Sequence, residues 1–164
     1  MLKSKHIIGL EHFPVSDLNK IIDTSFKFKD ILQTESRKAI LLKGKTLVNM
    51  FFENSTRTKI SFSLAEKRLG ADSINFSAST SSVKKGETLK DTVQNIESMK
   101  IDGAVIRHGH PGSALKLTEY IDGAVINAGD GSHEHPTQAI LDMVTLKENL
   151  EKLKVLKLEL SVIF

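Results

Sequence analysis

A short polar cluster, Ser-Thr-Arg-Thr at residues 55–58, combines three hydroxyl groups with one guanidinium. An apolar run at 46–52 precedes the cluster, and an amphipathic segment at 59–69 follows it, so the pattern predicts a strand, a tight turn and a helix N-terminus. The free N–H groups and the dipole of a helix N-terminus favour an anion. The hydroxyls and the guanidinium add directional donors and a fixed charge. The cluster therefore predicts a phosphate site, although helix capping accounts for one of the hydroxyls.

The chain contains no G-x-x-x-x-G-K-[ST] segment, so this is not a Walker phosphate loop. A metal site is the competing interpretation, because two His-x-His pairs are present: His108 with His110, and His133 with His135. Asp130 and Glu134 would add oxygen ligands. The cation Arg107, next to the first pair, opposes a dication, and glycine-rich loops do not preset the geometry of metal ligands. We therefore expect an anion here, and neither a metal nor another cofactor.

The elements around these residues alternate between strand and helix after a first helix at 15–32. The predicted strands lie at 46–52, 73–76, 104–106 and 124–126, and the predicted helices at 58–69, 88–99, 113–120 and 136–150. This alternation predicts an α/β fold with a parallel sheet flanked by helices. Ligands of such sheets bind outside the carboxyl ends of the strands. Polar residues follow all four strands, at 55–58, 79–85, 107–108 and 127–138, so the sequence predicts one anion pocket there.

Composition restricts the class of protein. The chain has 164 residues, of which 40% are hydrophobic and 26% charged, which is typical of a globular domain with its own core. It has no cysteine and a net charge of only +3 without a basic stripe, so we expect neither disulfides nor nucleic-acid binding. No apolar run approaches the roughly 20 residues of a membrane span, and no signal-peptide pattern follows the first lysines. We expect a cytoplasmic protein without membrane partners.

Four motifs, in this order and spacing, resemble the aspartate carbamoyltransferase family. They are F-x-x-x-S-T-R-T at 51–58, K-K-G-E-T-L at 84–89, R-H at 107–108 and G-D-G-x-x-x-H-P-T-Q at 129–138. The similarity extends from about residue 7 to about residue 157. The first and last motifs also occur in ornithine carbamoyltransferases, whereas the loop at 81–89 and the segment at 138–142 look like the aspartate branch.

The resemblance implies a function for each motif. Residues 1–150 would form the carbamoyl-phosphate-binding domain, with these substrate-binding residues: Ser55, Thr56, Arg57, Thr58, Arg107, His135 and Gln138. Among them, Arg57, Thr58, Arg107 and His135 would be catalytic. Ser81 and Lys85 would enter the site of a neighbouring subunit in a homotrimer, and regulatory chains are possible further partners.

The implied reaction is attack by the α-amino group of L-aspartate on carbamoyl phosphate, giving N-carbamoyl-L-aspartate and phosphate for pyrimidine biosynthesis. The resemblance implies catalysis by positioning of the two substrates and by preorganised hydrogen-bond donors, without a metal or a covalent intermediate. Residues 151–164 are expected to be the truncated start of the aspartate-binding domain, because the sequence from residue 157 departs from the family pattern. We therefore expect little activity from this chain alone. An ornithine-specific enzyme, an inactive phosphate-binding or assembly module and a metal hydrolase are the alternatives.

Overall fold

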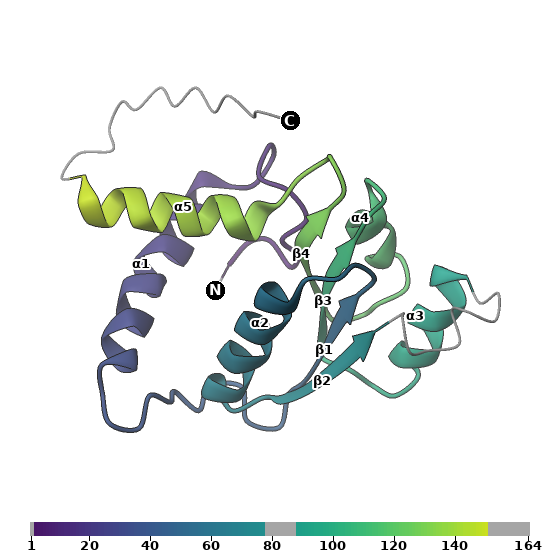
Figure 1. Cartoon of the computed structure of the whole chain (residues 1–164), viewed down its shortest axis with the longest axis horizontal. Helices are drawn as coiled ribbons and strands as arrows, with labels where there is room; N and C mark the ends of the chain where they lie inside the picture. The colour runs from purple at the N-terminus through teal and green to yellow at the C-terminus, as the bar shows by residue number, and fades with distance from the viewer. Residues whose placement is uncertain (1, 78–87, 151–164) are drawn as a thin grey trace.

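The computed structural model describes residues 2–77 and 88–150. Within these ranges four strands alternate with helices, and the helices cover both faces of one sheet (Figure 1). The elements, in chain order, are α1 (Val15–Leu32), β1 (Thr46–Phe51), α2 (Thr56–Leu69), β2 (Asp72–Ser77), α3 (Leu89–Glu97), β3 (Gly103–His108), α4 (Ser113–Leu117), β4 (Ala124–Asp130) and α5 (Pro136–Asn149). The predicted α/β class is confirmed.

All strand pairs in the sheet are parallel, and the strand order is β2-β1-β3-β4. The two inner strands pair with Val48 opposite Ala104 and with Phe51 opposite Arg107. Because the carboxyl ends of parallel strands meet at one edge of a sheet, this register places Arg107 beside the turn that leads into α2. The topology thus brings together three of the segments that the sequence singled out, at 55–58, 107–108 and 127–138; the fourth, at 79–85, lies outside the described residues.

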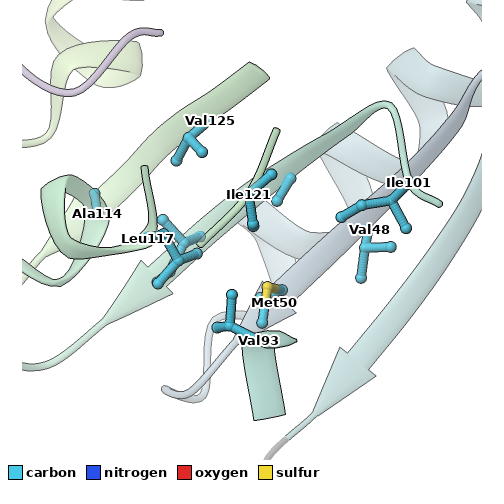
Figure 2. Packing of buried hydrophobic residues seen from close by; sticks show 10 residues of the cluster. Val48, Met50, Val93, Ile101, Ala114, Leu117, Ile121 and Val125 are labelled. Atoms are coloured by element: carbon cyan, nitrogen blue, oxygen red, sulfur yellow. The ribbon is translucent and has the colours of Figure 1, made fainter. Parts of the chain in front are cut away.

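The main hydrophobic core lies on the sheet face covered by α3 and α4. Alternate residues of β1, Val48 and Met50, point into it, and Val93 of α3 and Leu117 of α4 pack against them (Figure 2). Full burial of a side chain of this size is worth about 1.5–3 kcal/mol. The opposite face packs against α2 and α5, so these two helices are held where their N-termini can contribute to a site.

Local signals explain where several helices begin and end. Thr88 caps α3 by accepting from the backbone N–H of Asp91, whose carboxylate accepts in return from the backbone of Thr88. The helix α2 stops at Gly70, where φ is +83°, a conformation that glycine adopts without penalty. Pro136 occupies the first turn of α5. The backbone N–H of any residue at that position has no partner within the helix, so proline loses no hydrogen bond there.

Several predicted boundaries were wrong. The strand predicted at 104–106 extends to His108, and the strand predicted at 124–126 extends to Asp130. The polar residues at these strand ends therefore belong to the sheet, because pairing between β3 and β4 continues to His108 and Asp130 across an irregularity in register. The helix predicted at 113–120 ends at Leu117, and α2 begins at Thr56 rather than at residue 58.

Two predicted features lie outside the described residues: the loop with Ser81 and Lys85, and the segment 151–164. In the part of the chain that is described, no helix combines the length and apolar character needed to cross a membrane.

Candidate anion-binding site

The turn from β1 into α2 carries the Ser-Thr-Arg-Thr cluster. Ser55 is the N-cap residue, but its side chain makes no capping bond to the backbone. Instead, its hydroxyl donates to Oγ1 of Thr58 at 2.8 Å. Within the described residues, neither an ion pair nor a hydrogen bond engages the exposed guanidinium of Arg57. Side-chain capping by Ser55 therefore does not explain the cluster, and the N–H groups of the first turn remain available to an anion.

Arg107, from β3, is the partly buried cation of this region. Its Nη1 donates to the carbonyl oxygen of Ala128 at 2.9 Å and lies 3.2 Å from Nε2 of His135. Its Nε lies 3.4 Å from a carboxylate oxygen of Glu53. That Nε is also buried and lacks a hydrogen-bond acceptor among the described residues. One guanidinium thus spans the ends of β1 and β4 and the start of α5, and one of its donors is unsatisfied.

His135 precedes α5 as its N-cap residue and is half-buried. Burial lowers its pKa, and the positive charge of Arg107 lowers the pKa further, so the imidazole is neutral near pH 7. An arginine nitrogen can only donate. The contact with Nη1 therefore makes Nε2 the acceptor and places the proton on Nδ1, which lies 3.3 Å from Oγ1 of Thr137.

Three predicted site residues line one hollow of about 320 Å³ between α2 and α5. They are Thr58, His135 and Gln138, and the wall is completed by Ser61, Phe62, Ala65, Thr137 and Leu141. In this state the side-chain amide of Gln138 donates to Asp142 at 2.9 Å. A contact between that amide and a ligand in the hollow would need a change of rotamer.

The other predicted residues are not all in that hollow. Ser55 and Thr56 line a second hollow of about 300 Å³ together with Glu53 and Lys59. Arg57 lines neither of the two hollows. Ser81 and Lys85 lie outside the described residues. The predicted single pocket is therefore present only in part: the side chains of Ser55 and Thr58 touch, and those of Arg107 and His135 touch.

His108 does not belong to the anion site, although it directly follows Arg107. Its Nδ1 accepts from the backbone N–H of His110 at 2.9 Å and lies 3.0 Å from Oγ of Ser113, and its ring lies 5.0 Å from that of Phe52. Burial lowers the pKa of His108. Successive side chains of a strand point to opposite faces, which explains why the two neighbours separate. Among residues 2–77 and 88–150, no group of three His, Cys, Asp or Glu side chains is arranged to hold a metal ion.

We did not predict from the sequence that two acidic residues, Glu53 and Asp130, would take part in the anion site. Glu53 pairs with Arg107, and Asp130 is buried at the end of β4 beneath the turn that carries His135. The signals were present: Glu53 stands between the first strand and the hydroxyl cluster, and Asp130 stands between two glycines. Together the site offers a guanidinium, a neutral imidazole, hydroxyls and two helix N-termini, a set that can hold an oxyanion and polarise an adjacent carbonyl group.

Comparison with known proteins gives a consistent result. Residues 5–148 match the family model described as the carbamoyl-P binding domain of aspartate/ornithine carbamoyltransferases. The chain is 52% identical over 149 residues to the aspartate carbamoyltransferase catalytic subunit of Christiangramia forsetii, covering 91% of this chain and 48% of that protein. It is 51% identical over 150 residues to that of Desulfotalea psychrophila, covering 92% and 47%.

Solved structures agree with this result. Aspartate transcarbamoylase from Trypanosoma cruzi, in complex with carbamoyl phosphate and aspartate, matches with a TM-score of 0.84 and 35% identity over 92% of this chain and 47% of that one. The catalytic subunit of the M. Jannaschii enzyme matches with a TM-score of 0.82 and 40% identity, over 91% and 48%. The chain spans about half the length of the curated relatives it matches.

Proposed function

Since the chain belongs to the aspartate/ornithine carbamoyltransferase family, we propose that it binds carbamoyl phosphate and supplies this half of an aspartate carbamoyltransferase site. In the proposed reaction, the α-amino group of L-aspartate attacks the carbonyl carbon, and the bond to the phosphate oxygen breaks. The products are N-carbamoyl-L-aspartate and phosphate. The names of the relatives quoted above favour aspartate over ornithine as the acceptor.

The observation that carries this proposal is the contact between Arg107 and His135, 3.2 Å apart, beside the hollow that Thr58 lines. Negative charge develops on the carbonyl oxygen and on the departing phosphate during the reaction. A fixed guanidinium can stabilise both charges, and preorganised donors of this kind typically contribute about 10²–10³ in rate each. His135, which is neutral, serves as a polar partner and not as a nucleophile.

The roles of the remaining residues are part of the same proposal. Ser55, Thr56 and Arg57 bind phosphate at the N-terminus of α2, and Gln138 orients the carbamoyl amino group. Residues 1–150 act as the carbamoyl-phosphate domain of a cytoplasmic homotrimer, in which Ser81 and Lys85 reach the site of the neighbouring subunit.

Calorimetry tests the binding half of the proposal. The chain should bind carbamoyl phosphate and, more weakly, inorganic phosphate. His135→Ala should weaken both, whereas His12→Ala, a matched change at an exposed histidine, should leave both unchanged. Absence of heat with either ligand, or equal affinities in the two variants, would contradict the proposal.

An assay for carbamoyl-aspartate tests the catalytic half. Because this chain matches only about half of its relatives' length, we expect slow or undetectable turnover with aspartate. Turnover near that of full-length relatives would show that aspartate is bound by residues of this chain. Carbamoylation of ornithine in preference to aspartate would overturn the choice of acceptor.

A further inference from the structure

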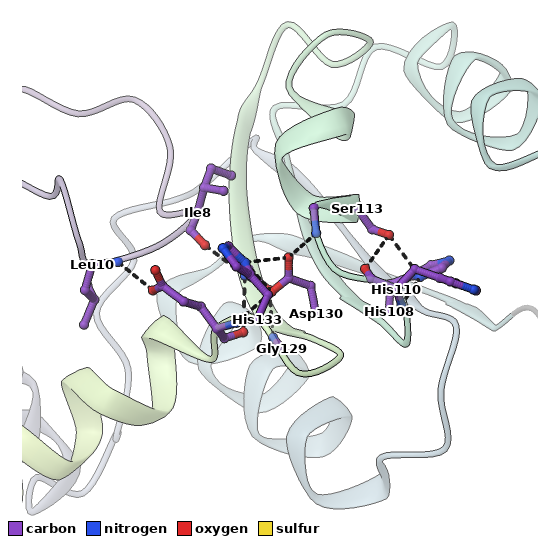
Figure 3. Close-up of polar contacts among 11 residues, drawn as sticks. Ile8, Leu10, His108, His110, Ser113, Gly129, Asp130 and His133 are labelled. Carbon is purple, nitrogen blue, oxygen red and sulfur yellow. Dashed lines mark hydrogen bonds and ion pairs between the residues drawn. The ribbon is translucent and has the colours of Figure 1, made fainter. Parts of the chain in front are cut away.

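Asp130, the last residue of β4, is a carboxylate buried to 1% exposure. Its oxygens accept hydrogen bonds from the backbone N–H of Gly112 at 2.8 Å, from the side-chain amide of Asn127 at 3.0 Å and from the backbone N–H of Glu134 at 3.2 Å (Figure 3). Nδ1 of His133 also lies 3.2 Å away. A buried carboxylate needs such donors to offset the loss of hydration. Three of the four donors, those of Asn127, His133 and Glu134, belong to the segment that leads into His135.

These bonds join three parts of the chain that are distant in sequence or turn sharply. Gly112 is the N-cap residue before α4, Asn127 lies within β4, and Glu134 lies in the turn between β4 and α5. The backbone of the same turn is closed by a bond from the N–H of Asp130 to the carbonyl of Glu134 at 3.2 Å. The carboxylate of Glu134, in turn, accepts from the backbone N–H of Leu10 at 2.7 Å. The turn is therefore anchored at its base by Asp130 and on its outer side by Leu10.

The two side chains of the anion site attach to either end of this anchored segment. His135 directly follows Glu134, and Arg107 donates to the carbonyl oxygen of Ala128, two residues before Asp130. We propose that Asp130 is a positioning residue of the site, whose carboxylate holds the turn 131–135 so that His135 stays in contact with Arg107 beside the bound anion. This inference rests on the proposed function and adds a residue that does not itself touch the ligand.

The charge of Asp130 fits this role. Burial alone would raise the pKa of its carboxyl, but the hydrogen bonds from Asn127, Gly112, Glu134 and His133 outweigh burial and lower the pKa. The group is thus ionised near neutral pH and accepts at every contact. An amide in its place keeps one accepting oxygen but presents an NH2 group to N–H donors at the other position. Asp130→Asn therefore keeps the size of the side chain and loses either the bond from Gly112 or the bonds from Asn127 and Glu134.

Asp102 provides a matched control. Its carboxylate also accepts from a backbone N–H, that of Thr46 at the start of β1, at 2.9 Å, and from Nζ of Lys45 at 2.7 Å. It lies at the amino end of the sheet, away from the anion site. Asp102→Asn therefore makes the same chemical change at a carboxylate that accepts two bonds, without touching the turn.

The experiment compares both variants with the parent chain by NMR titration of His135 and by calorimetry with inorganic phosphate. Loss of a nearby negative charge alone would lower the pKa of His135. Loss of positioning moves the ring away from Arg107 and into solvent, so its pKa should rise toward the ordinary value. We expect this rise, and about tenfold weaker phosphate binding, for Asp130→Asn, whereas Asp102→Asn should behave as the parent chain does.

The outcomes separate the two proposals. An unchanged or lowered pKa of His135 in Asp130→Asn, or an equal response in Asp102→Asn, would overturn the positioning role. If the parent chain does not bind phosphate, the proposed function fails, and the pKa of His135 alone decides the role of Asp130. If Asp130→Asn does not fold, hydrogen exchange in the parent chain decides: slow exchange at the amides of Gly112 and Glu134 supports the role, and exchange at the rate of an unprotected loop overturns it.

Discussion

Gly129 offers a direct way to disturb the contact between Arg107 and His135. Its φ is +118°, and a Cβ atom added there would lie 2.8 Å from Nη1 of Arg107 and 3.4 Å from Cδ2 of His135. The side chain of alanine therefore enters the space between the two groups. Because the guanidinium ends a long side chain with several rotatable bonds, we expect Gly129→Ala to displace it without destroying the fold.

Two effects contribute to the expected magnitude. A side chain at a positive φ of this kind costs about 1–3 kcal/mol of stability. When Nη1 moves, the bond to the carbonyl oxygen of Ala128, 2.9 Å long, is lost. A hydrogen bond to a charged group is worth about 1.5–3 kcal/mol, and about 1.4 kcal/mol corresponds to a factor of ten in affinity. Gly129→Ala should therefore bind phosphate about tenfold more weakly, or worse.

Gly44→Ala is the matched control. Gly44 has a φ of +75°, and a Cβ atom there would meet nothing within 4 Å. This variant should lose about 1–2 kcal/mol of stability through backbone strain and keep its phosphate affinity. Urea unfolding measures the first quantity and calorimetry the second. Equal phosphate affinity in the two variants would refute the reasoning, because the clash with Arg107 is what distinguishes them.

Further predictions concern charge. Arg57→Ala should abolish phosphate binding in calorimetry, whereas Arg68→Ala, near the other end of α2, should not; equal affinities would contradict the assignment. Burial raises the pKa of Glu66, although its hydrogen bonds oppose the shift. The protonated form of Glu66 therefore stabilises the fold fully at a pH below the ordinary pKa of a glutamate. This stabilisation is lost as the pH rises through the raised pKa of the folded state. Urea unfolding from pH 4 to 8 should show this loss in the parent chain and less of it in Glu66→Gln; parallel profiles would contradict the prediction. In full-length trimers, mixing inactive Lys85→Ala and Arg57→Ala subunits should restore activity after subunit exchange, and no recovery would mean that Lys85 serves its own subunit.

The sequence alone predicted the fold class and, among the described residues, the segments 55–58, 107–108 and 127–138 that lie at the carboxyl edge of the sheet. Helical and strand periodicities are local properties, and Gly70 and Pro136 mark helix ends for local steric reasons. The alternation of elements then restricts the connections to parallel strands with helices on both faces. The ends of β3 and β4 were predicted too early, because their last residues include polar ones and only strand pairing keeps them in the sheet.

Tertiary structure decided which side chains share a site. Arg107 and His135 are 28 residues apart, and they meet because β3 and β4 lie side by side in the sheet, a pairing that no local pattern encodes. The same pairing buries Asp130, which composition alone would place on the surface. Alternation along β3 sends His108 away from Arg107, although the two are adjacent in sequence. The kinds of chemical group available were thus readable from the sequence, whereas their contacts depend on packing between distant segments.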